Sequence, residues 1–306
     1  MGSNRPGVIA IVGPTCTGKS ALALWLASKI DGEIINADSM QVFRYFDIGS
    51  AKPSQEEQSR IPHHLIDVVL PHEEFNAALF QRMADRCIAE IWSRDRTPLT
   101  VGGTGLYLRV LFHGLFEVKT DHELRQALRD RFERDPEGMY EELKACDPEY
   151  AASINRKDRV RVVRALEIHH LSGSVMSEWQ ARHGFREERY RVLKIGLTGE
   201  RHELYRRINA RVESMLAQGW IDEARGILKA GYDRNLKPLN SIGYREIVQH
   251  LKGELNYAEM VEKIKISTRH YAKRQLTWFA KEKEISWNTF PEEKEAILKK
   301  VTKFLD

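Results

Sequence analysis

The eight residues from Gly13 to Ser20 have the types and spacing of a phosphate-binding loop. Their sequence, GPTCTGKS, fits the pattern G-x-x-x-x-G-K-[ST] and follows the apolar run VIAIV. In such a loop the backbone N–H groups converge on phosphate oxygens at a helix N-terminus, where the helix dipole favours anions. Lys19 adds a positive charge, and the Ser20 hydroxyl is suited to bind Mg²⁺. The loop therefore predicts binding of a phosphorylated ligand.

An acidic residue, Asp38, follows a second strand-like segment, where GEIINADSMQVF runs from strand into a loop at residues 37–39. A carboxylate at the end of a strand and near the loop can take a proton from a nucleophile. The same Ala-Asp-Ser sequence also suits a simple turn. ATPases and GTPases usually place a Mg²⁺-binding aspartate after a neighbouring strand, but the third strand-like segment ends in Gly102-Gly103-Thr104. The loop alone does not identify ATP as the ligand.

The elements that must position these residues alternate between strand and helix patterns. The expected strands cover 8–12, the start of GEIINADSMQVF and 99–101, and the expected helices cover 19–30, 75–92 and the region of 106–111. This order predicts an α/β fold with a doubly wound parallel sheet. Ligands of such sheets bind at the carboxyl ends of the strands. We therefore expect the loops 13–20, 38–41 and 102–105 to lie together.

The residues from 118 to 189 predict a helical insertion, because they are densely charged, rich in helix formers and without a strong strand signal. RYRVLKIGLT, residues 189–198, returns to a strand pattern and is expected to rejoin the sheet. The remaining residues are expected to be helical, with an apolar stripe of Leu204, Ile208, Val212 and Met215 and a stop at Gly219. The expected domains are 1–117, the insertion 118–189, and 190–306, which completes the core and adds C-terminal helices.

The composition excludes several classes of protein. The chain has 306 residues, 42% of them hydrophobic and 30% charged, as in ordinary globular proteins. No apolar run approaches the roughly 20 residues of a membrane helix, and no secretory signal is recognisable. The three cysteines form no CxxC pair and no zinc spacing, which suits a reducing cytoplasm. We expect a cytoplasmic monomer that makes no membrane contact. The net charge of +4 permits an anionic partner.

Two basic stretches could bind RNA phosphates. Lys157, Arg161 and Arg164 recur at helical spacing, and Val162, Val163 and Leu166 would face away from them. The second stretch interleaves Arg269, Lys273 and Arg274 with Tyr271 and Trp278. Taken alone, each stretch is more often a solvated helix face.

An ordered set of motifs resembles the tRNA dimethylallyltransferase family, also called tRNA isopentenyltransferases, in its short bacterial-type form. The motifs run from the loop to about Phe279: GPTCTGKS, NADSMQVFRYFDIGSAKP, PHHLID, VGGTGLYLRVLFHGL, RVRVVRALEI, NSIGYREI and TRHYAKRQLTWF. The resemblance implies a P-loop nucleotide-kinase-like core with a helical insertion. It also implies transfer of a dimethylallyl group from dimethylallyl diphosphate to N6 of the adenosine 3′ of the anticodon in tRNA. Mg²⁺ is the implied cofactor.

The resemblance further implies roles for particular residues. It implies that Asp38 is the general base, that Thr104 lies near the reacting centre and that Arg211 reaches the diphosphate. The implied diphosphate site is Gly13, Pro14, Thr15, Cys16, Thr17, Gly18, Lys19 and Ser20, with Ser20 on the metal. The implied tRNA contacts are Asp38, Ser39, Met40, Gln41, Thr104, Arg125, Val160, Arg161, Val162, Val163, Arg164, Leu239, Asn240, Ser241, Ile242, Gly243 and Tyr244.

Three other functions use the same features. A small-molecule or nucleotide kinase would use the loop for ATP, with Asp38 as base and the insertion as lid. An adenylate isopentenyltransferase would prenylate free adenine nucleotides. A non-catalytic RNA-binding protein could retain a degenerate core. The lack of an acidic residue after the third strand disfavours the kinase. The large insertion with a basic patch favours a macromolecular acceptor over a free nucleotide. The intact phosphate-binding loop and Asp38 disfavour a non-catalytic protein.

Overall fold

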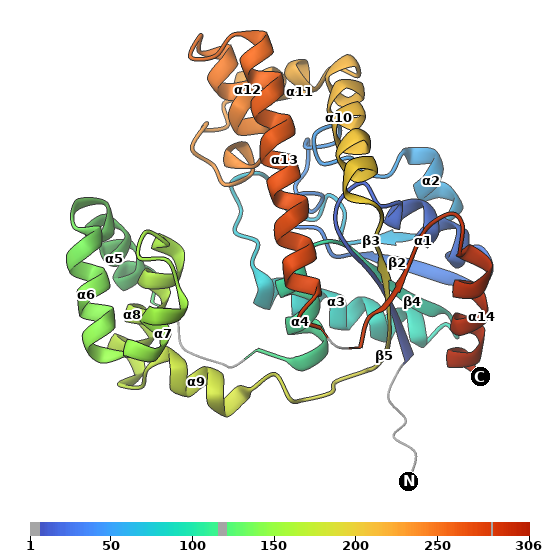
Figure 1. The fold of residues 1–306 in the computed structure, drawn as a ribbon, viewed down its shortest axis with the longest axis horizontal. Helices are drawn as coiled ribbons and strands as arrows, with labels where there is room; N and C mark the ends of the chain where they lie inside the picture. Colours follow the sequence, from blue (N-terminus) through green and yellow to red (C-terminus); the bar gives the residue numbers. More distant parts are fainter. Residues whose placement is uncertain (1–6, 116–120, 283) are drawn as a thin grey trace. The chain divides into compact units, whose positions relative to one another are not determined.

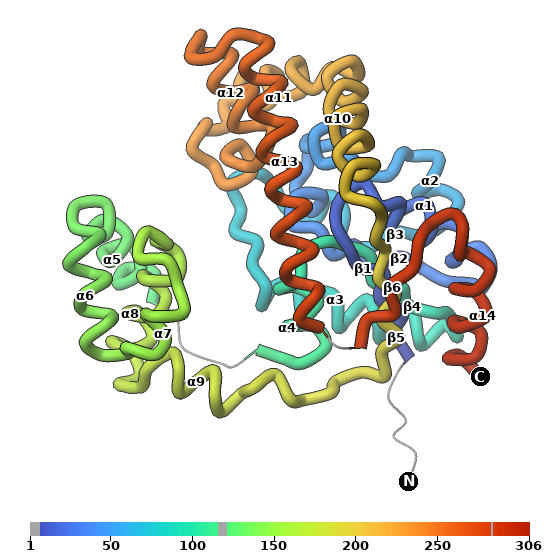
Figure 2. Tube along the Cα trace, in the orientation of Figure 1, coloured from blue at the N-terminus to red at the C-terminus, as the bar shows by residue number. Residues whose placement is uncertain are grey.

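The chain folds into two compact units in a computed structural model that describes residues 7–115, 121–282 and 284–306. Unit 1 comprises residues up to 112 together with 188–306, and unit 2 comprises residues 113–187. Figure 1 shows the elements of both units, and Figure 2 follows the chain out of unit 1 and back into it. Val118, the first residue of the expected insertion, lies outside the described residues.

Unit 1 contains a six-stranded parallel sheet in the order β3-β2-β4-β1-β5-β6. Its strands are β1 (Gly7–Val12), β2 (Gly32–Asn36), β3 (His63–His64), β4 (Thr97–Val101), β5 (Arg191–Leu197) and β6 (Ser286–Asn288). The predicted parallel α/β sheet is confirmed. The edge strands β3 and β6 were not expected, because they are only two and three residues long and lack an apolar run.

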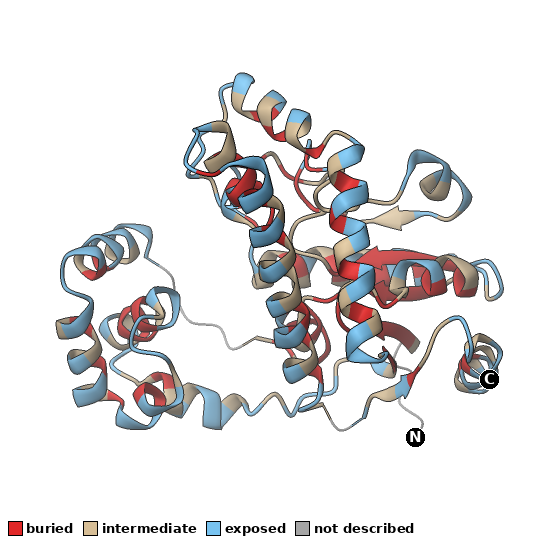
Figure 3. Cartoon of the chain, turned by 45° about the horizontal axis from the view of Figure 1, so that its top comes forward, coloured by how far each residue is buried: buried red, intermediate tan, exposed pale blue. Residues whose placement is uncertain are grey.

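Helices cover both faces of the sheet because successive strand residues point to opposite sides. In β1, Val8, Ala10 and Val12 belong to one buried cluster with α3 (Ala77–Trp92) and α4 (Gly105–His113). Ile9 and Ile11 belong to the other, with α1 (Lys19–Ala27) and α14 (Lys294–Leu305). Figure 3 shows the buried central strands in red. This enclosure explains the uninterrupted apolar run of β1, VIAIV.

Two expected helix boundaries were wrong by a few residues. The helix α1 ends at Ala27 instead of residue 30, and Asp31, with φ 47°, then turns the chain into β2. The helix α3 begins at Ala77 instead of residue 75, because the side chain of Asn76 caps it by accepting a hydrogen bond from Leu79 N.

The remaining helices of unit 1 are α2 (Gln55–Arg60), α10 (Arg201–Ala217), α11 (Trp220–Lys229), η1 (Pro238–Asn240), α12 (Tyr244–Leu251) and α13 (Tyr257–Phe279). The predicted apolar stripe is confirmed, because Leu204, Ile208, Val212 and Met215 are the buried residues of α10. The predicted stop is also confirmed: Gly219, with φ 98°, separates α10 from α11.

Unit 2 is helical in its described part. Its helices are α5 (His122–Arg134), α6 (Pro136–Cys146), α7 (Pro148–Ser153), α8 (Arg159–Ser172) and α9 (Met176–His183). Four of them start at an aspartate whose carboxylate accepts a backbone N–H of the first turn: Asp121, Asp135, Asp147 and Asp158. The unit has a buried apolar cluster of its own. Among the described residues of both units, no helix is long and apolar enough to cross a membrane.

Candidate active site

Three loops meet at the carboxyl edge of the sheet, as the sequence predicted. The loop after β4 lies against the end of β2, where Thr104 N donates to Ala37 O over 3.4 Å, and against β1, where Gly102 N donates to Ile11 O over 3.2 Å. A Cβ atom on residue 102 would lie 2.2 Å from Ala37 O. Glycine is therefore required at 102 for this close approach, which sets Asp38 beside the loop 102–105.

The phosphate-binding loop is closed by side-chain hydrogen bonds to one carbonyl. Lys19 Nζ and Thr17 Oγ1 donate to Pro14 O over 2.5 and 2.9 Å. Gly18 precedes α1 with φ 92°, and no side chain of the described residues caps this helix. The N–H groups of its first turn therefore remain open to an anion.

A bound phosphate would stabilise the charged form of the Lys19 ammonium group. Burial lowers the pKa of its ammonium group to about 8, and the Arg211 guanidinium also lowers it, against the Cys16 thiol and the Asp38 carboxylate, which raise it. A nearby anion favours the charged form. Binding of a phosphate group therefore strengthens protonation of Lys19.

The Asp38 side chain forms the turn that its sequence suits. Its Oδ1 accepts hydrogen bonds from Met40 N and Gln41 N over 2.7 and 3.4 Å, which forms a turn. Its own N–H donates to Asn36 Oδ1 over 3.2 Å. Within the described parts of the chain, no residue donates a hydrogen bond to Oδ2, so this oxygen can receive a proton or a donor from a ligand.

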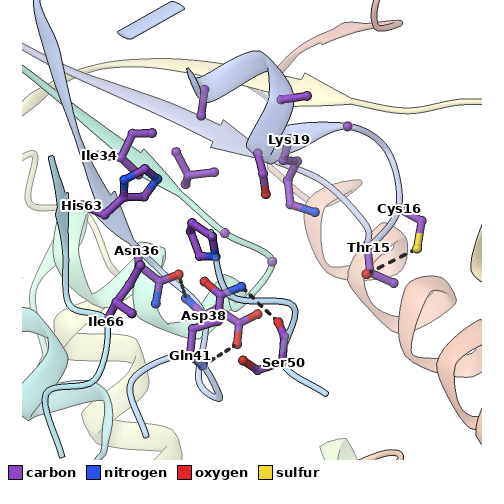
Figure 4. A pocket seen from close by; sticks show the side chains of 18 of the residues that line it. Thr15, Cys16, Lys19, Ile34, Asn36, Asp38, Gln41, Ser50, His63 and Ile66 are labelled. Carbon is purple, nitrogen blue, oxygen red and sulfur yellow. Dashed lines mark hydrogen bonds between the residues drawn. The ribbon is translucent and has the colours of Figure 1, made fainter. Parts of the chain in front are cut away.

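A first cavity of about 190 Å³ opens between the phosphate-binding loop and Asp38. Figure 4 shows Lys19, Asp38 and Gln41 around it, with His63 and Ile66. Its lining is mainly polar at the loop, and Ile34 and Ile66 add apolar side chains beside His63 and Asn36. The first cavity suits a small phosphorylated molecule with a short apolar part.

A second cavity of about 430 Å³ lies on the other side of Asp38. Its lining includes Ser39 and Met40, Val212 and Met215 of α10, and the polar or basic residues Lys237, Asn240, Ser241, Arg245 and Arg274. Six residues line both cavities: Thr15, Cys16, Asp38, Ser50, Arg211 and Tyr271. Asp38 is thus positioned between two spaces, one beside the phosphate-binding loop and one beside α10 and α13.

Two further expected site residues, Arg211 and Thr104, differ in whether they line the cavities. Arg211 lies at the junction, with Nη1 4.0 Å from Cys16 Sγ, and faces both cavities. Thr104 is on the lining of neither, and its Oγ1 is buried. It lies near the phenol of Tyr271, whose pKa is raised by burial and by the Asp38 carboxylate.

Sequence reasoning missed a residue that joins two of the loops. Gln275 of α13 accepts from Thr15 N over 2.9 Å and donates to Gly103 O over 3.0 Å. Its side chain is buried and lines the first cavity. The signal was a glutamine three residues after Ala272 and four before Phe279, both of which are buried on α13, because a polar residue on a buried face needs a partner.

The expected tRNA-binding segment 239–244 divides into two groups. Asn240, Ser241 and Ile242 line the second cavity. The side chains of Leu239 and Tyr244 are instead buried, each 1% exposed. Leu239, in η1, and Tyr244, at the start of α12, pack in the core and do not face the second cavity.

Unit 2 has a basic cavity of its own, of about 480 Å³, between α5 and α8. Its cationic lining residues are Arg125, Arg129, Arg159 and Arg164. The fully buried Glu167 carboxylate holds two of them, accepting from Arg125 Nε over 3.0 Å and Arg164 Nη1 over 2.8 Å. Asp130 and Glu133 also line the cavity, and Glu133 pairs with Arg159, so its four arginines outnumber its two carboxylates.

The expected basic face of α8 needs one correction. Lys157 precedes the helix, which starts after the cap Asp158, so Lys157 does not share a helical face with Arg161 and Arg164. The chain turns at 156–157 because the Asn155 side chain accepts from Lys157 N. Of the other expected contacts here, Val160 is 73% exposed, whereas Val162 and Val163 are buried.

The residues of the first cavity fit a magnesium ion held together with a phosphate. Mg²⁺ typically binds one or two protein oxygens, substrate phosphate oxygens and water. The Ser20 hydroxyl is exposed in the first turn of α1 and lines the first cavity with Asp38. The described residues contain no cluster of three His, Cys, Asp or Glu side chains, so an ion here would depend on phosphate oxygens.

The parallel sheet, the phosphate-binding loop and the two adjoining cavities define an α/β protein with a P-loop kinase-like core. Residues 41–282 match the IPP transferase family, and the chain belongs to that family. The chain is 49% identical over 299 residues to the tRNA dimethylallyltransferase of Geobacter metallireducens, covering 97% of each chain. It is 45% identical to the tRNA dimethylallyltransferase of Geobacter sulfurreducens, covering 98% of this chain and 97% of the relative.

Solved structures show the same fold. The full-length tRNA isopentenylpyrophosphate transferase of Bacillus halodurans has a TM-score of 0.74 at 38% identity, with 98% of this chain and 97% of that chain covered. A eukaryotic dimethylallyltransferase acting on tRNA has a TM-score of 0.78 at 29% identity, with 97% of this chain and 77% of that chain covered.

Proposed function

We propose that the protein transfers the dimethylallyl group of dimethylallyl diphosphate to N6 of the adenosine 3′ of the anticodon in tRNA and releases diphosphate. Family membership and the names of the relatives support this reaction. The observation that carries it is the position of Asp38, which lines both cavities. A donor in the first cavity and an acceptor in the second would meet at this carboxylate.

The first cavity offers groups that would stabilise the diphosphate leaving group of the donor. Breaking the allylic C–O bond leaves its electron pair on diphosphate, so negative charge develops at the loop. Loop N–H groups, Lys19 and Arg211 would stabilise that charge, and Arg211 faces both cavities. Mg²⁺ bound at Ser20 would neutralise further charge on the leaving diphosphate.

Asp38 offers a carboxylate that could take a proton from N6 of the acceptor. The lone pair of N6 forms the new N–C bond, and N6 must lose one proton for the product to be neutral. Asp38 would accept that proton at Oδ2 and orient the amine beforehand. Thr104 is proposed to act near this centre, on the side of Tyr271. Both cavities are formed within one chain, which supports action as a monomer.

The tRNA would bind to both units. In unit 1, Asn240, Ser241 and Arg274 offer polar and basic groups at the second cavity, where an extruded base could be read. In unit 2, the basic cavity offers arginines to backbone phosphates. A tRNA acceptor supports a cytoplasmic location.

A three-arm assay tests this function against its alternatives. Purified protein with Mg²⁺ receives labelled dimethylallyl diphosphate with unmodified tRNA, the same donor with AMP, or labelled ATP without donor. We expect label in tRNA alone. Label in AMP alone would identify an adenylate isopentenyltransferase, and ATP turnover without prenyl transfer would identify a kinase.

A further inference from the structure

The carboxylate of Glu223, on α11, gathers four hydrogen bonds from elements far apart in sequence. Its Oε2 accepts from the backbone N–H groups of Asp47 and Ile48 over 2.8 and 2.7 Å. Its Oε1 accepts from Gly49 N over 3.2 Å and from the Tyr244 hydroxyl over 2.5 Å. Three successive backbone donors of an irregular loop are thus tied to one side chain.

The packing around these bonds leaves the loop no room to move toward α11. A Cβ atom on residue 49 would lie 1.9 Å from Trp220 Nε1, so glycine is needed there. Trp220 and Tyr244 are 3% and 1% exposed, and their rings meet edge to face at 5.5 Å. The Glu223 carboxylate therefore sets where residues 47–49 lie.

The same loop orients Gln41 at the active site. Gln41 Nε2 donates to Ser50 O and Ala51 O, over 3.0 Å each. Because carbonyl oxygens only accept, the amide must turn its NH₂ group toward the loop and leave Oε1 as an acceptor. No described residue donates a hydrogen bond to this Oε1. Gln41 lines the first cavity with Asp38, and Ser50 lines both cavities.

We propose that Glu223 is a positioning residue for the acceptor base: it fixes residues 47–51 and thereby the orientation of the Gln41 amide beside Asp38. This inference rests on the proposed function. The N6 amine of the acceptor enters from the second cavity and must reach Asp38, at the junction with the first cavity, where Gln41 lies. An exocyclic amine is a donor, and the fixed Oε1 is the matching acceptor. Glu223 acts through Gln41 and does not itself line either cavity.

The test uses full-length Glu223→Ala and Glu223→Gln, with Asp222→Ala as matched control. Asp222 is the exposed neighbour on α11 and pairs only with Arg225 among the described residues. We expect Glu223→Ala to lower kcat/KM for tRNA by about ten- to a hundredfold, while the KM for dimethylallyl diphosphate stays within about twofold of wild type. Glu223→Gln should fall in between, because an amide offers one acceptor oxygen to four donors. Asp222→Ala should match wild type.

A double-mutant cycle with Gln41→Ala separates positioning from general stability. If Glu223 acts through Gln41, the double variant loses no more tRNA kcat/KM than the worse single variant. The proposal would be overturned if the losses of tRNA kcat/KM in the two single variants added up in the double variant. It would also be overturned if Glu223→Ala changed the kinetic constants for tRNA and dimethylallyl diphosphate equally, or left kcat/KM for tRNA unchanged. Should Glu223→Ala not fold, the cycle is run with Glu223→Gln, and the same outcomes decide. A wild-type protein that transfers nothing to tRNA would instead refute the proposed function.

Discussion

Asp38 uses one carboxylate oxygen to hold its turn and leaves the other for a ligand. Asp38→Asn keeps an oxygen that can accept from Met40 N, but an amide cannot take a proton. We therefore expect turnover to fall by about a hundredfold or more, with tRNA affinity within about threefold of wild type. Single-turnover transfer and filter binding measure the two quantities. Equal losses in both would show that Asp38 acts in binding and not as a base.

The ammonium group of Lys19 gives the donor site a pH dependence. Its pKa is lowered from 10.5 to about 8, so the free protein loses this positive charge as the pH rises through about 8. Affinity for inorganic diphosphate should be highest below pH 8 and fall by up to about tenfold per pH unit above it. Calorimetric titration from pH 6.5 to 9.5 measures this.

Lys19→Met is the control for the ionisation of diphosphate itself. This variant should bind weakly at all pH values and without the additional decrease above pH 8. A wild-type profile parallel to that of Lys19→Met would exclude Lys19 as the titrating group.

At the scale of elements, α13 fixes the donor site through Gln275. Gln275→Leu would leave Thr15 N and Gly103 O unpaired, which should lower the free energy of unfolding by about 2 kcal/mol. It should also raise the KM for dimethylallyl diphosphate about tenfold while changing that for tRNA less. Denaturant titration and initial rates measure these effects.

Gln218→Ala is the matched control, because Gln218 is exposed at the end of α10 and bonds only to Ser214 Oγ through its side chain among the described residues. We expect it to behave as wild type. If Gln275→Leu raised both KM values equally, α13 would not act specifically on the phosphate-binding loop.

The elements that the sequence predicted are those with a strong local pattern. The strand β1 is a buried run of apolar residues, β4 has a strand pattern at Leu99-Thr100-Val101 after Pro98, and α10 has a complete apolar stripe. The strands β3 and β6 gain their structure from pairing with β2 and β5, and pairing with a distant strand leaves no local signal. The first residue of α3 is set by the side-chain cap of Asn76, which the apolar pattern of the helix does not reveal.

The candidate site was predictable where a motif includes neighbouring residues, as in the phosphate-binding loop and at Asp38. Gln275 and Glu223 could not be predicted in the same way, because their partners lie 260 and about 175 residues away. The burial of Tyr244 depends on the fold around Trp220. These contacts exist only in the tertiary structure.

For the whole molecule, the account requires electrostatic binding of RNA by unit 2. Arg129→Ala removes one cationic residue from the basic cavity. We expect weaker tRNA binding and a decrease of about one in the slope of log affinity against log salt. Fluorescence anisotropy at several salt concentrations measures the slope. Arg225→Ala, on α11 of unit 1, should leave the slope unchanged, and an equal decrease in both variants would contradict a specific role for the basic cavity.

The most direct test of the central claim follows the label from dimethylallyl diphosphate into tRNA. The protein is given either an unmodified tRNA with adenosine 3′ of the anticodon or the same tRNA with guanosine there, which has no N6 amine. The account predicts label in the first tRNA alone, in one nucleotide at that position. Equal label in both tRNAs, or none in either, would contradict it.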